Sequence, residues 1–309
     1  MEKDGRFSRK VFWAINAIAC AFFIALMVVA TKYDLEINHA LSDGDSFFAD
    51  LFAIIGEFPA YFAVPVGGVI VFFNAQNFNE KYKRVLIRVV GCLAVFGGWF
   101  FFFYAGTKLT DVPHLLGFSL TGAAGIGAVS LWVGSLVKKE TMNKLFKYGV
   151  FLIVFTLVTL AVIQISKNVF CRMRYRDMLK DGDFDGFTPW YKINIGRENP
   201  NPDYHYTSFP SGHTSSAAHV FVLCVLCDLY PALNKKRVRA VMNVCCFAFT
   251  AVVAIARIVD NAHFLSDVLV GGYVTYLIFV LCRYIFFGKG KYNFRIADKK
   301  DEEGESLEQ

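Results

Sequence analysis

The stretch VLIRVVGCLAVFGGWFFFFYA, residues 85–105, decides the fold class of this chain. Its only charged residue, Arg88, lies near one end. A bilayer core about 30 Å thick is crossed by roughly 20 consecutive apolar residues in a helix. The helix is required because lipid offers no partner for unpaired backbone groups. We therefore predict that residues 85–105 form a helix that spans a membrane.

Seven further apolar blocks of similar length extend this pattern along the chain: 11–31, 52–74, 115–137, 148–166, 213–230, 239–256 and 264–287. Hydrophobic residues make up 55% of the chain and charged residues only 19%, whereas soluble proteins carry about 25% charged residues. The predicted fold is all-α, a polytopic membrane helix bundle with about eight transmembrane helices. Residues 1–287 then form a single membrane domain, and the highly charged segment 288–309 is expected to be a mobile C-terminal tail.

Lysine and arginine gather in alternate short loops, and this sets the predicted orientation. Segments 1–10, 75–84, 138–147 and 231–239 are basic, whereas 32–51 holds one lysine against five acids. Because basic loops stay on the cytoplasmic side, we predict that both termini are cytoplasmic. The long segment 167–212 and the turn 257–263 then lie outside. The net charge of +6 reflects this topology, and we expect no nucleic-acid partner.

A histidine and a carboxylate, His263 and Asp267, lie four residues apart at the predicted start of the last span. Four residues place both on one face of a helix. A carboxylate there can bind one ring nitrogen and leave the other free and more basic, as a nucleophile requires. The alternative is that the pair only ties two helices together.

The sequence Pro210-Ser211-Gly212-His213 opens the sixth block. The start of a helix presents unpaired N–H groups that bind anions such as phosphate, and His213 beside them could protonate a leaving oxygen. Taken alone, this motif is explained better by an ordinary helix cap with a solvated histidine.

A basic cluster follows the fifth block, against the charge bias of the external side. It contains Lys167, Arg172, Arg174 and Arg176, with Asp177 among them. A phosphate or anionic headgroups would account for the cluster. Snorkelling of long side chains to the interface is the alternative, and it accounts for one or two of these residues more easily than for all four.

Together the three stretches resemble the motifs of the type 2 phosphatidic acid phosphatases. This lipid phosphate phosphatase superfamily shares its site with vanadium haloperoxidases and glucose-6-phosphatase. The first family motif is Lys, six residues, Arg-Pro, and Lys167 to Arg174 matches it with Tyr175 in place of proline. The second, Pro-Ser-Gly-His, is complete at 210–213.

The third motif is Ser-Arg, five residues, His, three residues, Asp. It appears here as Ala256-Arg257, His263 and Asp267, with alanine in place of serine. The resemblance is close over residues 165–270, the motif core, and extends to the surrounding helices only in pattern. Neither departure removes a residue with a chemical role in the family.

The resemblance implies a role for each matching residue. His263 attacks phosphorus and forms a phosphohistidine, Asp267 orients it, and His213 protonates the leaving group. The phosphoryl oxygens are bound by Lys167, Arg174, Ser211, Gly212 and Arg257, and Arg172 is an additional candidate. The family needs no metal, and we expect no cofactor.

The expected function is removal of phosphate from a membrane lipid phosphate or diphosphate at the external face. Undecaprenyl diphosphate, phosphatidylglycerol phosphate and phosphatidate are the candidate substrates. A phosphotransferase that uses an acceptor alcohol, or a non-catalytic lipid-phosphate binder or transporter, is the alternative. The chain contains no Asn-x-Ser/Thr sequon, which favours a bacterial plasma membrane. No obligate protein partner is evident.

Three other residues are secondary candidates. Glu57 could line the pocket or pair with a cation, Asp260 is expected to be a turn residue, and His219 is expected to be a hydrogen-bonded core histidine.

Overall fold

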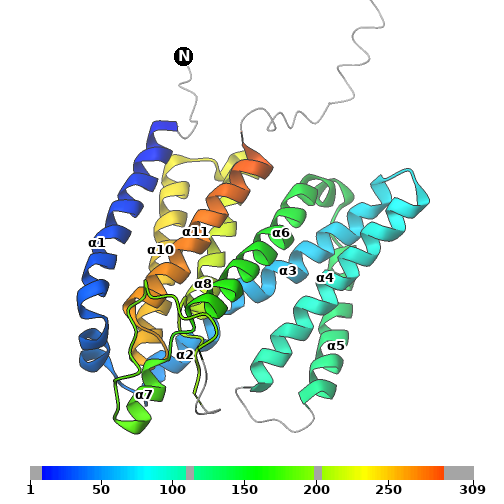
Figure 1. Cartoon of the computed structure of the whole chain (residues 1–309). Helices are drawn as coiled ribbons and strands as arrows, with labels where there is room; N and C mark the ends of the chain where they lie inside the picture. The colour runs from blue at the N-terminus through cyan, green and yellow to red at the C-terminus, as the bar shows by residue number, and fades with distance from the viewer. Residues whose placement is uncertain (1–8, 109–114, 198–203, 289–309) are drawn as a thin grey trace, which may run out of the picture.

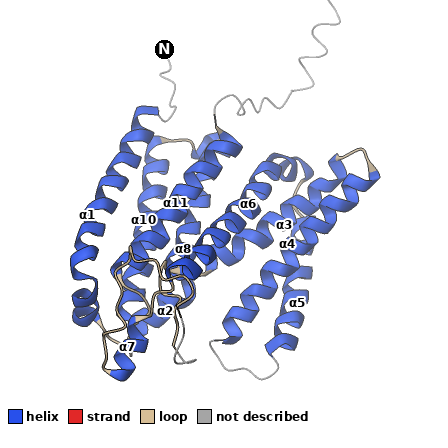
Figure 2. Cartoon of the chain, viewed as in Figure 1, coloured by secondary structure: helices blue, strands red, loops and turns tan. Residues whose placement is uncertain are grey.

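The computed structural model describes residues 9–108, 115–197 and 204–288, and every regular element in these ranges is helical (Figure 2). The predicted C-terminal tail from residue 289 onward lies outside the described residues, as does most of the basic segment 1–10. In chain order the elements are α1 Arg9–Leu41, α2 Phe47–Ile55, α3 Phe58–Asn74, η1 Ala75–Asn77, α4 Lys81–Lys108, α5 Leu115–Ser135, α6 Lys139–Phe170, α7 Tyr175–Asp181, α8 Gly212–Ala218, η2 His219–Val225, α9 Leu226–Leu229, η3 Pro231–Leu233, α10 Lys236–Val259 and α11 Leu265–Phe287.

Eight helical segments of the described chain are long and apolar enough to cross a membrane, which confirms the predicted fold class. Two of them are composite. The second runs through α2, α3 and η1, and the sixth runs from α8 through the 3₁₀ segment η2 to α9. The protein is therefore an all-helical integral membrane protein.

The predicted first span was too short. It was expected to end at residue 31, but α1 continues to Leu41 after a non-helical residue at Tyr33. Residues 32–41 contain two acids and one asparagine, a polarity that predicts a loop. Two of these polar residues, Asp34 and Asn38, are buried. Because both have hydrogen-bonding partners on other elements, their polarity does not end the helix.

The spans form a bundle in which α8 packs against both α10 and α11, and α3 packs against α4 and α6 (Figure 1). Aromatic rings fill the space between α6, η2 and α11, where Phe155, Phe221 and Phe279 are buried together. The long segment between α6 and α8, which includes α7, lies at one end of the bundle. The described chain ends, at the start of α1 and the end of α11, lie at the other (Figure 1).

Candidate active site

The three predicted stretches meet at the end of the bundle that carries α7. Lys167 lies in the last turn of α6, His213 in the first turn of α8, and Arg257 in the last turn of α10. His263 lies in the turn between α10 and α11. The rings of His213 and His263 face each other with centroids 6.5 Å apart. Residues separated by up to 96 positions in the sequence therefore surround one small region.

His263 and Asp267 form a pair, but not on one helix face as predicted. The helix α11 begins at Leu265, so His263 precedes both the helix and its N-cap, Phe264. Asn261, in the left-handed region with φ 58°, turns the chain there. The His263 Nδ1 atom lies 3.6 Å from Asp267 Oδ2. Because Asp267 lies beside Nδ1, Nε2 is the ring nitrogen that could act as a nucleophile.

Asp267 is held rigidly by groups other than the histidine. Its Oδ2 accepts hydrogen bonds from the backbone N–H of Phe264 at 3.0 Å and from the hydroxyl of Ser208. Its Oδ1 pairs with Arg172 at 2.7 Å. The carboxylate is fully buried, and such a charge is tolerated because it is paired and hydrogen-bonded.

The imidazole of His263 is neutral at pH 7. Its pKa is lowered to about 3, mainly by burial and also by the nearby charges of Arg174 and Arg257, while Asp267 opposes the shift. Only a neutral imidazole has a lone pair to attack with. The residue therefore has the protonation state that a nucleophile needs.

The second histidine, His213, has a carboxylate of its own. Glu57, at the junction of α2 and α3, places Oε1 3.3 Å from His213 Nε2. Tyr61 donates a hydrogen bond to the other oxygen of Glu57 at 3.1 Å. The sequence left two roles open for Glu57, lining the pocket or pairing with a cation, and the structure places it in contact with a site residue. Glu57 touches a histidine, and the charges of Lys167 and Arg257 also act on it.

The Pro-Ser-Gly-His motif opens a helix, as predicted. Ser211 is the N-cap of α8, and its hydroxyl accepts a hydrogen bond from Thr214 N at 3.4 Å. The Ser211 N–H donates to the carbonyl of Asp267 at 2.9 Å, so the motif is fixed to the start of α11. Lys167 Nζ comes within 3.4 Å of the position that a Cβ on Gly212 would take. The lysine ammonium therefore lies next to the backbone of Gly212.

Two arginines complete the positive surroundings of the histidines. Arg174 donates to Thr207 Oγ1 at 3.4 Å, and Arg257 is paired with Asp260 at 2.8 Å. The charges of both arginines, and of Lys167, act on the His213 ring. Asp260 therefore does more than form a turn, because it fixes the Arg257 guanidinium. The basic groups that the sequence proposed for phosphate thus surround the histidine pair.

Arg172 is placed differently from the other cations of its cluster. It is buried, and its guanidinium pairs with Asp267 and with Asp34 of α1. It therefore supports the carboxylate behind His263 and does not face the region between the two histidines.

Four buried residues around His263 were not predicted from the sequence: Asp34, Asn38, Ser208 and Ser266. Asn38 donates to the carbonyl of His263 at 3.1 Å. The sequence carries one signal of this arrangement, because Asp34 and Asn38 are an acid and an amide four residues apart, next to an apolar block. Helical periodicity places such a pair on one face of a helix.

The remaining histidines of the described chain have structural partners. His219 shares a hydrogen bond with the carbonyl of Ser215 at 2.9 Å, and its ring packs at a tilt against that of Phe155, which confirms a hydrogen-bonded core histidine. His39 is hydrogen-bonded to the hydroxyl of Tyr175 at 2.8 Å. The tyrosine that replaces the family's proline is therefore buried and bonded.

No group of three or more His, Cys, Asp or Glu side chains within residues 9–108, 115–197 and 204–288 is arranged to hold a metal ion. The chemical resources of this region are two histidines, each beside a carboxylate, and three surrounding cations.

Comparison with known proteins finds a family match in the second half of the chain. Residues 148–291 match the model of the PAP2 superfamily. No curated protein and no solved structure matched the chain. The matched range begins within α6 and contains all three motifs, whereas α1 to α5 lie before it.

Proposed function

We propose that this chain, with its PAP2 superfamily domain, is a metal-independent phosphatase of membrane lipid phosphates or diphosphates that works through a phosphohistidine. Members of the superfamily are typically metal-independent phosphatases. The observation that carries the proposal is the pairing of two histidines 6.5 Å apart, one of them neutral and buried beside a carboxylate.

In the first step, His263 Nε2 attacks phosphorus, so that a P–N bond forms as the bond to the lipid oxygen breaks. The leaving oxygen takes a proton from His213, which acts as general acid. The nucleophile's ring becomes positive, and Asp267 stabilises that charge. Positive groups around the phosphoryl oxygens lower the energy of the transition state, and Lys167 and Arg257 are placed for this.

In the second step, His213, now neutral, removes a proton from water. The resulting nucleophile attacks phosphorus, the P–N bond breaks, and inorganic phosphate leaves with His263 neutral again. Every proton lost by His213 in the first step is regained in the second, so the enzyme returns to its starting state.

The test is phosphate release by the purified protein in EDTA from three lipids: undecaprenyl diphosphate, phosphatidylglycerol phosphate and phosphatidate. We expect release from at least one lipid and none from His263→Ala. His205→Ala is the matched control, because the His205 side chain is exposed on the long segment between α6 and α8 and pairs with Asp177. Full activity in His263→Ala would disprove the mechanism.

The same assay separates hydrolysis from transfer to an alcohol. A hydrolase releases phosphate in water alone, whereas a transferase needs an added acceptor such as glycerol. A binder or transporter releases none under either condition.

We place the site on the external face of a bacterial plasma membrane. The support is the alternation of basic and non-basic loops in the sequence, together with the position of the site at the end of the bundle opposite the start of α1 (Figure 1). Asp185→Cys and Lys235→Cys test this with an impermeant maleimide. External reagent should label position 185 and not position 235, and the reverse pattern would overturn the orientation.

A further inference from the structure

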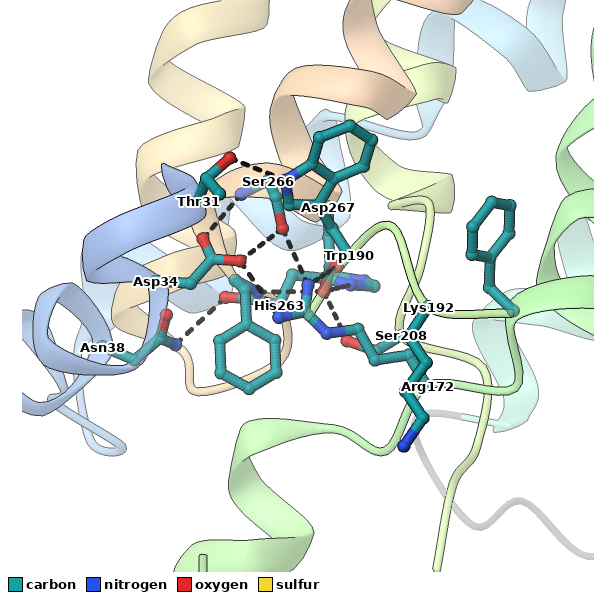
Figure 3. Close-up of polar contacts among 12 residues, drawn as sticks. Thr31, Asp34, Asn38, Arg172, Trp190, Lys192, Ser208, His263, Ser266 and Asp267 are labelled. Carbon is teal, nitrogen blue, oxygen red and sulfur yellow. Dashed lines mark hydrogen bonds and ion pairs between the residues drawn. The ribbon is translucent and has the colours of Figure 1, made fainter. Parts of the chain in front are cut away.

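The first helix enters the site although it lies outside the PAP2 domain. Figure 3 shows Asp34 and Asn38 of α1 pointing toward His263, Ser266 and Asp267. Both α1 side chains are buried, with 3% and 0% of their surfaces exposed. A buried acid in a membrane protein is costly and marks a function by default. The partners of Asp34 indicate what that function is.

Asp34 is bound to the start of α11 by two hydrogen bonds. Its Oδ1 accepts from the backbone N–H of Ser266 at 2.9 Å, and its Oδ2 accepts from the Ser266 hydroxyl. Ser266 lies between His263 and Asp267 in the sequence. The carboxylate of α1 therefore fixes the turn that carries the proposed nucleophile.

Arg172 joins Asp34 to Asp267. One guanidinium nitrogen lies 3.0 Å from Asp34 Oδ2, and the other lies 2.7 Å from Asp267 Oδ1 (Figure 3). The guanidinium also lies over the ring of Phe264, with its carbon 4.1 Å from the ring centroid. One cation is thus shared between two buried carboxylates, which leaves the cluster with one net negative charge.

Two further contacts fix α1 in this place. The amide of Asn38 donates to the carbonyl of His263 at 3.1 Å. The indole N–H of Trp190, from the long segment between α6 and α8, donates to the Thr31 hydroxyl at 2.9 Å. Both the backbone of the proposed nucleophile and the segment between α6 and α8 are therefore bonded to α1.

We infer that Asp34 is a positioning residue for the phosphoryl-transfer reaction, acting through Arg172 and Asp267 on His263; this rests on the proposed function. With Asp34 present, Arg172 divides its charge between two carboxylates, and Asp267 keeps part of its negative charge for the His263 ring. The net negative charge of the cluster then balances the positive ring that forms during attack.

Loss of the Asp34 charge should have a specific consequence. In Asp34→Asn, the amide oxygen can still accept from Ser266 N, and the side chain keeps its size. Arg172 would then pair with Asp267 alone. Asp267 would hold His263 Nδ1–H less strongly, and Nε2 would become a weaker nucleophile.

The experiment compares wild type, Asp34→Asn and Glu36→Gln. Glu36 is a carboxylate two residues away on the same helix, but it is exposed. The first measurement is a single turnover of labelled phosphatidate with enzyme in excess, since its rate constant does not depend on the folded fraction. The second is the inhibition constant of inorganic phosphate, which reports on the cations. The third is carbethoxylation of His263 by diethyl pyrocarbonate, followed by mass spectrometry, which needs no activity.

We expect Asp34→Asn to slow the single turnover by roughly 10- to 100-fold, the usual effect of losing a partner behind a reacting group. Carbethoxylation of His263 should slow about tenfold, the lower end of the same range, while the inhibition constant of phosphate and all values for Glu36→Gln stay near wild type.

Equal rates in Asp34→Asn and Glu36→Gln would overturn the inference and leave the phosphatase proposal standing. Faster carbethoxylation in Asp34→Asn would also overturn it, because a merely structural residue exposes His263 when removed. If even wild type releases no phosphate from any lipid, the proposed function fails. The carbethoxylation rates then still decide whether Asp34 positions His263.

Discussion

Gly271 on α11 offers a sharp test of how closely the site is packed. A Cβ added at this position would lie 2.3 Å from the carbonyl oxygen of Ser211, whereas ordinary van der Waals contact begins at 3.4 Å. The obstacle is backbone, not the end of a flexible side chain. Gly271→Ala therefore requires the chain at Ser211 to move by about 1 Å, a distance set by that difference.

The displaced residue lies two positions before His213 and is hydrogen-bonded through its N–H to the carbonyl of Asp267 at 2.9 Å. A misplacement of about 1 Å in a catalytic arrangement costs roughly 100-fold in rate. Overpacking also costs about 1–3 kcal/mol of stability. We expect the single-turnover rate constant to fall by about 100-fold, in line with that estimate, while the protein remains folded.

The assay is single-turnover phosphate release from phosphatidate in detergent micelles, with thermal unfolding measured in parallel. Gly125→Ala is the control, because Gly125 is also helical but has nothing within 4 Å of its Cβ position. That variant should keep the wild-type rate and gain up to about 1 kcal/mol from better helix propensity. A Gly271→Ala rate equal to that of Gly125→Ala would refute the packing argument.

Three further outcomes follow from the site. The pKa of His263 is about 3 in the folded protein, mainly because of burial, and about 6.5 in the unfolded chain. The unfolded state therefore binds the proton more readily, and the free energy of unfolding decreases as the pH falls below about 6.5. The thermal midpoint should therefore drop less between pH 7 and pH 5 in His263→Gln than in wild type, and equal drops would contradict the shift. Glu57→Gln removes a charge 3.3 Å from His213 Nε2, but the amide oxygen can still accept a hydrogen bond from Tyr61. We expect kcat to fall roughly tenfold, which is below the usual contribution of a general acid or base because Glu57 acts through His213. Tyr61→Phe should stay near the wild-type rate, and an unchanged Glu57→Gln would exclude a role for that carboxylate. Arg257→Lys keeps the charge but loses the planar guanidinium group that Asp260 holds. The inhibition constant of inorganic phosphate should therefore rise about tenfold, as expected for one lost charge-assisted hydrogen bond. An unchanged inhibition constant would place Arg257 outside the phosphate site.

Much of this protein was predictable from local sequence. The apolar blocks predicted the eight spans because the length and polarity of a membrane-crossing helix are set by the bilayer, whatever its neighbours are. The cap at Ser211 was predictable because a helix start depends on residues within one turn. The predicted helix boundaries were wrong where tertiary contacts satisfy polar side chains, as in residues 32–41 of α1.

The motifs in the sequence predicted that His213, His263, Asp267 and the surrounding cations form the reactive set. Only the tertiary structure decided how they are held. Asp34 lies 232 positions before Ser266, and a carboxylate on one helix carries no local sign of its partner on another. The same holds for Glu57, which the sequence placed near the end of a span and the structure places against His213. Buried charges are stable only when opposite charges meet them in three dimensions, and that matching is a property of the assembled bundle.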